Sequence, residues 1–130
     1  MIFVDTNVFM YAVGGPHPLR DTARRFFADC VHDEAPLCTS AEVVQELVHA
    51  YLPVARTQTL DRALSLITRA RVDVWPLEHE DVTLARQLHE SHPTLGARDL
   101  CHLASCRRRG VREVRTFDQA LGAIAGVSAE

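Results

Sequence analysis

The chain has 130 residues, the size of one domain that can bury a hydrophobic core of its own. Hydrophobic residues make up 47% of it and charged residues 24%, so the composition is that of a globular protein and not of a disordered or fibrous one. A formal net charge of −3 argues against a strongly cationic protein that coats DNA, although it leaves local basic patches open.

Short apolar runs indicate strands, which we predict at residues 2–4, 37–39, 72–75 and 114–117. Apolar residues at helical spacing, bounded by caps, glycines or prolines, indicate helices. We predict these at residues 6–13, 19–31, 41–52, 57–70, 81–90 and 97–109, with a short helix from Gln119. Strands that alternate with helices predict a parallel sheet covered on both faces. We therefore expect one α/β domain that spans residues 1–130.

The N-terminal stretch lacks the pattern of a targeting signal, because no Lys or Arg precedes its apolar residues and Asp5 follows them. No apolar run approaches the roughly 20 residues that a membrane-spanning helix needs. The four cysteines are scattered without C-x-x-C spacing, which favours reduced thiols in the core. We therefore predict a cytoplasmic protein that does not associate with membranes.

Three aspartates follow predicted strands or begin predicted helices. Asp5 comes directly after residues 1–4, at the carboxyl end of a strand, where open α/β sheets collect ligands. Asp99 lies in the first turn of a helix, where the helix dipole favours an acid by about 0.3–1 kcal/mol. Asp118 follows the last predicted strand, where Asp is a common turn or cap residue. Taken singly, each aspartate is explained by its local structural role.

Two glutamates, Glu42 and Glu46, lie nearly opposite the apolar stripe of the helix predicted at 41–52. A solvated helix face explains both of them. A functional role requires this face to border other acids in the fold, which the sequence alone does not show.

The ordered set of acids resembles the PIN-domain nucleases, and within them the VapC toxins of bacterial toxin–antitoxin pairs. The resemblance rests on residues 4–7, on Ser40 with Glu46 six positions later, on residues 97–104 and on residues 116–118. It covers essentially the whole chain, in order and with matching spacing. Phe117 departs from the pattern, because relatives often carry a small or polar residue between Thr116 and Asp118.

The resemblance implies a single PIN-like domain with a central, mostly parallel sheet flanked by helices. It also implies a metal-dependent endoribonuclease whose catalytic, metal-binding acids are Asp5, Glu46, Asp99 and Asp118. Glu46 is preferred because its spacing from Ser40 matches the family, and Glu42 is the runner-up ligand. The resemblance gives supporting roles to Thr6, Asn7 and Thr116, with Asp118 binding a second ion or a metal water.

Oxygen ligands without histidine or thiolate suit Mg²⁺ or Mn²⁺ better than Zn²⁺. A carboxylate pocket can hold one or two such ions, roughly 3.5–4 Å apart when there are two, which activate water for attack on a phosphodiester. Acids that converge without a cation repel one another, which raises the pKa of at least one. The seven histidines show no ligand spacing, and we assign none of them to the site.

The resemblance further implies an RNA substrate, a cognate antitoxin and a homodimer. Apolar side chains on two of the predicted helices offer a surface for an amphipathic peptide of the antitoxin, although they equally well pack on one another. They are Phe26, Phe27 and Val31 on the first and Leu60, Leu64 and Ile67 on the second. The alternatives are a housekeeping RNA-processing nuclease and a catalytically silent PIN-like binding module. The RNA cleaved, the number of ions and the identity of the antitoxin stay open.

All 14 basic residues are arginines, and the absence of lysine bears on a rival class. Phosphoaspartate enzymes and receiver domains also place an Asp after the first strand, but they require a lysine close to it. For Arg107, Arg108 and Arg109 we prefer a structural role at a helix C-terminus, with Gly110 as the cap, over contacts to RNA phosphates.

Overall fold

A five-stranded sheet, parallel throughout, forms the centre of the molecule in the computed structural model, which describes residues 1–124 and 128–129. The strands are β1 (Ile2–Val4), β2 (Leu37–Ser40), β3 (Asp73–Trp75), β4 (Glu113–Thr116) and β5 (Ser128–Ala129), in the order β3-β2-β1-β4-β5. Phe3 in β1 pairs with Cys38 on one side and with Val114 on the other. The first strand of the chain is therefore the central strand of the sheet.

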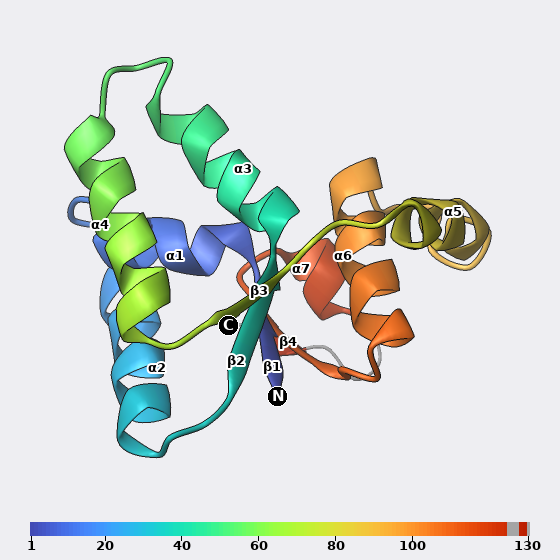
Figure 1. Cartoon of the computed structure of the whole chain (residues 1–130), viewed down its shortest axis with the longest axis horizontal. Coiled ribbons are helices and arrows are strands. Elements are labelled where there is room, and N and C mark those ends of the chain that lie inside the picture. The colour runs from blue at the N-terminus through green and yellow to red at the C-terminus, as the bar shows by residue number, and fades with distance from the viewer. Residues whose placement is uncertain (125–127, 130) are drawn as a thin grey trace.

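Helices cover both faces of this sheet. They are α1 (Thr6–Val13), α2 (Arg20–His32), α3 (Ala41–Tyr51), α4 (Thr57–Arg69), α5 (His79–Leu88), α6 (Ala97–Arg108) and α7 (Gln119–Gly122). Figure 1 shows α1, α2 and α4 on one side of the sheet and α5 and α6 on the other. In the part of the chain that the structure describes, no helix combines the length and the apolar character needed to cross a membrane.

The predicted α/β architecture is confirmed, and the predicted strands and helices form with boundaries shifted by one or two residues. The largest local difference is at α5, which begins at His79 rather than at Asp81. The cause is a capping box in which Asp81 Oδ2 accepts the backbone N–H of Glu78 at 2.8 Å, so Asp81 becomes the third residue of the helix. Strand β5 was not predicted, because two residues carry no periodic signal.

The hydrophobic core lies on both sides of β1. Phe3 is fully buried, and its ring packs against Trp75 at a centroid distance of 5.8 Å and against His102 of α6 at 5.4 Å. In the helical layer of α1 and α2, Phe9 and Phe27 pack with their centroids 5.2 Å apart. Each such side chain contributes roughly 1.5–3 kcal/mol by burial. All four cysteines are free and buried, in agreement with the predicted core thiols.

A fully buried carboxylate, that of Asp81, joins α5 to the C-terminal end of α6. Its Oδ1 accepts hydrogen bonds from Arg108 Nη1 at 2.7 Å and from Arg109 Nη1 at 3.2 Å. The Arg109 guanidinium also lies over the Trp75 ring, 4.7 Å from its centroid. Burial opposes the charged form of Asp81, but the backbone N–H of Glu78 and the two guanidinium groups outweigh it and lower the pKa of Asp81.

This ion pair gives Arg108 and Arg109 the structural role that the sequence favoured. Arg108 lies nine residues beyond Asp99 on the same helix, which corresponds to about 14 Å along the helix axis. Arg108 and Arg109 therefore stabilise the end of α6 that is remote from Asp99.

We predict that Asp81→Asn lowers the free energy of unfolding at pH 7 by about 1.5–3 kcal/mol, because charge-assisted hydrogen bonds are lost from a buried site. Since the folded pKa lies below the unfolded one, this contribution is complete above the unfolded pKa and is lost as the pH falls through the folded pKa. Urea denaturation at pH 7 and at progressively lower pH should show the gap between wild type and mutant closing in acid. The exposed Asp61→Asn is the control, and a mutant as stable as wild type at pH 7 would contradict the prediction.

Candidate active site

Asp5 lies where the central strand β1 ends, and it is the N-cap of α1. Its Oδ1 accepts the backbone N–H of Thr6 at 2.8 Å, and its Oδ2 accepts the hydroxyl of Thr116 at 2.7 Å. The side chain is buried, so these two hydrogen bonds fix the carboxylate in place. The cap role that the sequence suggested is real, and it orients the acid toward the other candidate residues.

Glu46 of α3 is brought against the start of α1. Its Oε2 accepts the Thr6 hydroxyl at 2.9 Å, its side chain is only 14% exposed, and Arg98 Nη1 lies 4.0 Å away. Glu42, one turn earlier, is half-buried on the same face of the helix. Of the two interpretations left open by the sequence, a solvated face does not describe Glu46, because Thr6 of α1 and His102 of α6 lie against its carboxylate.

Asp99 and His102 approach Asp5 from α6. One ligand atom from each of the three side chains lies within 4.8 Å of the other two. His102 Nε2 is 3.2 Å from Glu46 Oε1 and 3.8 Å from Asp5 Oδ1, and the ring is 2% exposed. His102 was not predicted as a site residue. The available signal was its spacing of three residues from Asp99, which places both side chains on one face of a helix.

Asp118 lies beside this group but has a structural task as well. Its Oδ1 accepts the backbone N–H of Leu121 at 3.0 Å, which caps α7, and its own N–H donates to the Thr116 hydroxyl at 3.0 Å. Its charge is close enough to act on the pKa of Asp99. The structure thus places Asp118 at the rim of the cluster, with one carboxylate oxygen committed to the cap.

The residues expected to support the site connect its separate elements. The Thr116 hydroxyl, besides bonding Asp5, accepts the Asn7 side-chain amide at 3.4 Å. Asn7 Oδ1 in turn accepts the backbone N–H of Phe117 at 3.1 Å. Thr6, Asn7 and Thr116 therefore join α1, α3 and the end of β4 around the acids.

The pKa shifts have the direction expected of converging acids, although burial contributes more to them than mutual repulsion does. Burial, reinforced by the charges of Asp5 and Asp118, raises the pKa of Asp99 to about 6. Burial also raises the pKa of Asp5, and of Glu42. Glu46 is the exception: burial opposes ionisation, but the adjacent His102 ring and the Thr6 hydroxyl outweigh it and lower the pKa of Glu46.

The donor atoms of this group fit a divalent cation. Among the described residues, Glu42 Oε2, Glu46 Oε1 and His102 Nε2 are buried and have no hydrogen-bond partner. A buried polar atom without a partner costs roughly 1–3 kcal/mol, so native structures seldom keep such atoms without a reason. The two carboxylate oxygens, beside the converging acids, are donors of the kind that hard cations bind.

Comparison with known proteins agrees with this architecture. The PIN domain model matches residues 2–127. Ribonuclease VapC23 of Mycobacterium tuberculosis is 59% identical over 121 residues, which are 93% of this chain and 95% of the relative. Ribonuclease VapC13 of the same species is 33% identical over 127 residues, which are 98% of this chain and 97% of the relative. The chain therefore belongs to the PIN-domain family, as a VapC-type member.

Solved structures share the fold at lower identity. VapC20 of Mycobacterium tuberculosis, described as a Sarcin-Ricin loop cleaving toxin, superposes with a TM-score of 0.78 at 21% identity, over 95% of this chain and 94% of that one. A chain of a toxin–antitoxin complex from Klebsiella pneumoniae gives a TM-score of 0.72 at 17% identity, over 99% of this chain and 97% of that one. At these identities the likeness establishes the shared fold.

We predict that Asp99→Asn raises the melting temperature of the protein in chelator at pH 7.5 and has little effect at pH 4. Because the folded pKa of about 6 exceeds the unfolded one, ionisation of Asp99 destabilises the fold as the pH rises from about 4 to 6, and fully above that. Differential scanning calorimetry across this pH range is the measurement, with the exposed Glu80→Gln as the control. A lower melting temperature for Asp99→Asn at pH 7.5 would refute the prediction.

Proposed function

We propose that this protein is a metal-dependent endoribonuclease toxin of a type II toxin–antitoxin pair, and that residues 1–130 act as one nuclease domain. The observation that carries the proposal is the convergence of Asp5, Glu46 and Asp99 from three separate elements at the carboxyl end of β1. The relatives named as VapC ribonucleases support the same activity.

In this proposal Asp5, Glu46 and Asp99 bind Mg²⁺ or Mn²⁺, and Asp118 binds a second ion or a water at its edge. Glu42 is the runner-up ligand. When bound, such an ion lowers the pKa of the attacking water and offsets the negative charge that develops on the phosphodiester. The chain itself contributes fixed carboxylates, since hydroxyl groups of Thr6 and Thr116 hold Glu46 and Asp5 in place.

The RNA approaches, in this proposal, past Arg98 and past a group of aromatic rings next to Asp118. Arg98 lies in the first turn of α6 beside Glu46, with a side chain that is 59% exposed, which suits a contact to a phosphate. Tyr11, one turn after Asn7, packs its ring against Phe117 at 5.3 Å and against the exposed His17 at 4.3 Å. Aromatic rings of this kind stack on unpaired bases.

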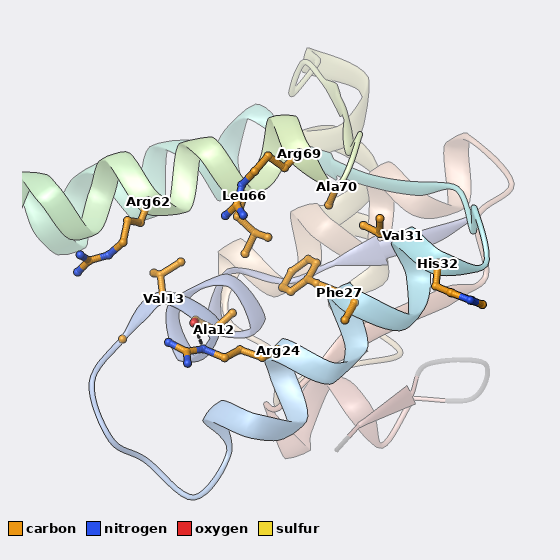
Figure 2. A pocket seen from close by; sticks show the side chains of 12 residues that line it. Ala12, Val13, Arg24, Phe27, Val31, His32, Arg62, Leu66, Arg69 and Ala70 are labelled. Atoms are coloured by element: carbon orange, nitrogen blue, oxygen red, sulfur yellow. Dashed lines mark hydrogen bonds between the residues drawn. The ribbon is translucent and has the colours of Figure 1, made fainter.

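The antitoxin would occupy a groove of about 940 Å³ between α1, α2 and α4. Figure 2 shows Phe27 of α2 and Leu66 of α4 pointing into it, with Arg62 and Arg24 at its rim. Such a groove suits an amphipathic segment with apolar anchors and acidic neighbours. The groove lies between the two helices proposed from the sequence and includes Phe27 and Val31, but on α4 it is lined by Leu66, whereas Leu60 and Ile67 are buried in the core.

A homodimer in the cytoplasm completes the proposal. It rests on membership of the VapC group, and light scattering of the purified protein would test the dimer. A housekeeping RNA-processing nuclease, or a catalytically silent PIN-like module, would also retain the fold. Growth arrest on expression and metal-dependent cleavage separate the toxin from these two alternatives.

We predict that the purified protein cleaves total bacterial RNA with Mg²⁺ or Mn²⁺ and not with chelator. Asp5→Asn and Asp99→Asn should abolish cleavage while circular dichroism shows an intact fold, because each removes a ligand charge. Glu46→Gln should reduce cleavage more than Glu42→Gln, its matched control one turn away on α3. Full activity of a folded Asp5→Asn or Asp99→Asn protein would show that the substituted residue is not a metal ligand. A larger loss of cleavage in Glu42→Gln than in Glu46→Gln would show that Glu42, and not Glu46, is the ligand.

We predict that Leu66→Asp, in the floor of the groove, leaves RNA cleavage unchanged but prevents suppression by the product of the adjacent gene. A buried charge opposite an apolar anchor costs binding energy. Leu64→Asp is the matched control, since Leu64 is exposed on the same helix and does not line the groove. Growth of cells that co-express both proteins, together with co-purification, is the measurement. Suppression that survives Leu66→Asp would place the antitoxin elsewhere.

A further inference from the structure

His102 is a buried polar residue that does not belong to the acid pattern, and packing alone does not explain why a histidine occupies its position. It lies at the middle of α6 with only 2% of its side chain exposed. Its ring packs on Phe3 with the planes tilted by 41°. That contact fixes the ring but satisfies neither of its nitrogen atoms.

The contact between His102 and Glu46 is close but is not a well-formed hydrogen bond. His102 Nε2 and Glu46 Oε1 are 3.2 Å apart, yet neither has a hydrogen-bond partner with acceptable geometry among the described residues. An imidazolium that served only as a counter-ion to Glu46 would direct an N–H at that oxygen. Nε2 therefore has no well-formed hydrogen bond that the entry of a cation would have to break.

The distances are close to those between ligands of a single ion, so small side-chain movements would bring the donor atoms onto it. Ligands about 2.1 Å from an octahedral ion lie about 3 Å apart when adjacent and about 4.2 Å apart when opposite. His102 Nε2 is 3.2 Å from Glu46 Oε1 and 3.8 Å from Asp5 Oδ1. Asp99 completes the group, with ligand atoms of Asp5, Asp99 and His102 all within 4.8 Å of one another.

We propose that His102 is a nitrogen ligand of the divalent ion at this site, through Nε2, and that it biases the site toward Mn²⁺ over Mg²⁺. Imidazole suits transition-metal ions, whereas Mg²⁺ is bound almost entirely by oxygen. The ring binds in its neutral form, so any proton on Nε2 is released to solvent when the ion enters. This inference rests on the proposed function in one respect only, namely that the carboxylates hold an ion.

The test is electron spin echo envelope modulation of the full-length protein loaded with Mn²⁺, prepared with unlabelled histidine and with ¹⁵N-histidine. We expect a modulation from a directly bound ¹⁴N nucleus that changes to the ¹⁵N pattern on labelling. The experiment uses the wild-type chain, so it does not depend on the stability of any variant. Because only histidine is labelled, the arginine and backbone nitrogens near the site cannot produce the change.

Substitution supplies the second measurement. In His102→Gln we expect the nitrogen modulation to disappear and the affinity for Mn²⁺ to fall by about 10–100-fold, the range that changes around metal ligands produce. Isothermal titration should show a much smaller change for Mg²⁺. His49→Gln is the control, because His49 lies exposed on α3, the helix that carries Glu46.

The outcomes separate this inference from the proposed function. Bound Mn²⁺ without any histidine-derived modulation would overturn the role of His102 while leaving a carboxylate metal site intact. Equal losses of Mn²⁺ and Mg²⁺ affinity in His102→Gln would show that the ring acts by packing or charge alone, which also overturns it. Failure of the wild-type protein to bind Mn²⁺ at all would contradict the proposed metal dependence, and it would also overturn the inference about His102.

Discussion

The burial of one carboxylate at the end of the central strand constrains the rest of this structure. Asp5 must remain satisfied in the interior, and the fold provides the Thr6 backbone N–H and the Thr116 hydroxyl for that purpose. These two contacts connect β1 to α1 and to the end of β4. Because Asp5 is fixed in this way, the acids on α3 and α6 meet it at one end of the sheet.

Bringing these acids together lowers the stability of the ion-free protein, because their negative charges repel one another. The same concentration of negative charge favours the binding of a cation. Burial and like charge raise the pKa of Asp99 to about 6, so at neutral pH the ion-free cluster holds carboxylates that resist ionisation. A bound cation relieves that repulsion, and binding to the native state alone stabilises it by mass action, by about 2.7 kcal/mol at 100 times the dissociation constant. Stability and activity are therefore linked through the same atoms.

The two candidate surfaces lie at opposite ends of α1. Asp5 caps its N-terminus, while Ala12, Val13 and Gly14 at its C-terminus line the groove with α2 and α4. The helix has eight residues, which is about 12 Å of axial length. A protein partner in the groove would thus lie close to the acids without having to contact them. Its binding affinity can therefore be changed by substitutions that leave the acids untouched.

The sequence by itself determined the alternation of strands and helices and the positions of Asp5 and Asp99, because apolar periodicity and caps are local signals. It also carried the ordered acid pattern of the PIN family. Only the tertiary structure decided that Glu46 faces the cluster and not solvent, that His102 joins it, and that Leu66 lines the groove. Such assignments depend on which element packs over a given face, and a helical wheel identifies opposite faces without showing what covers either one.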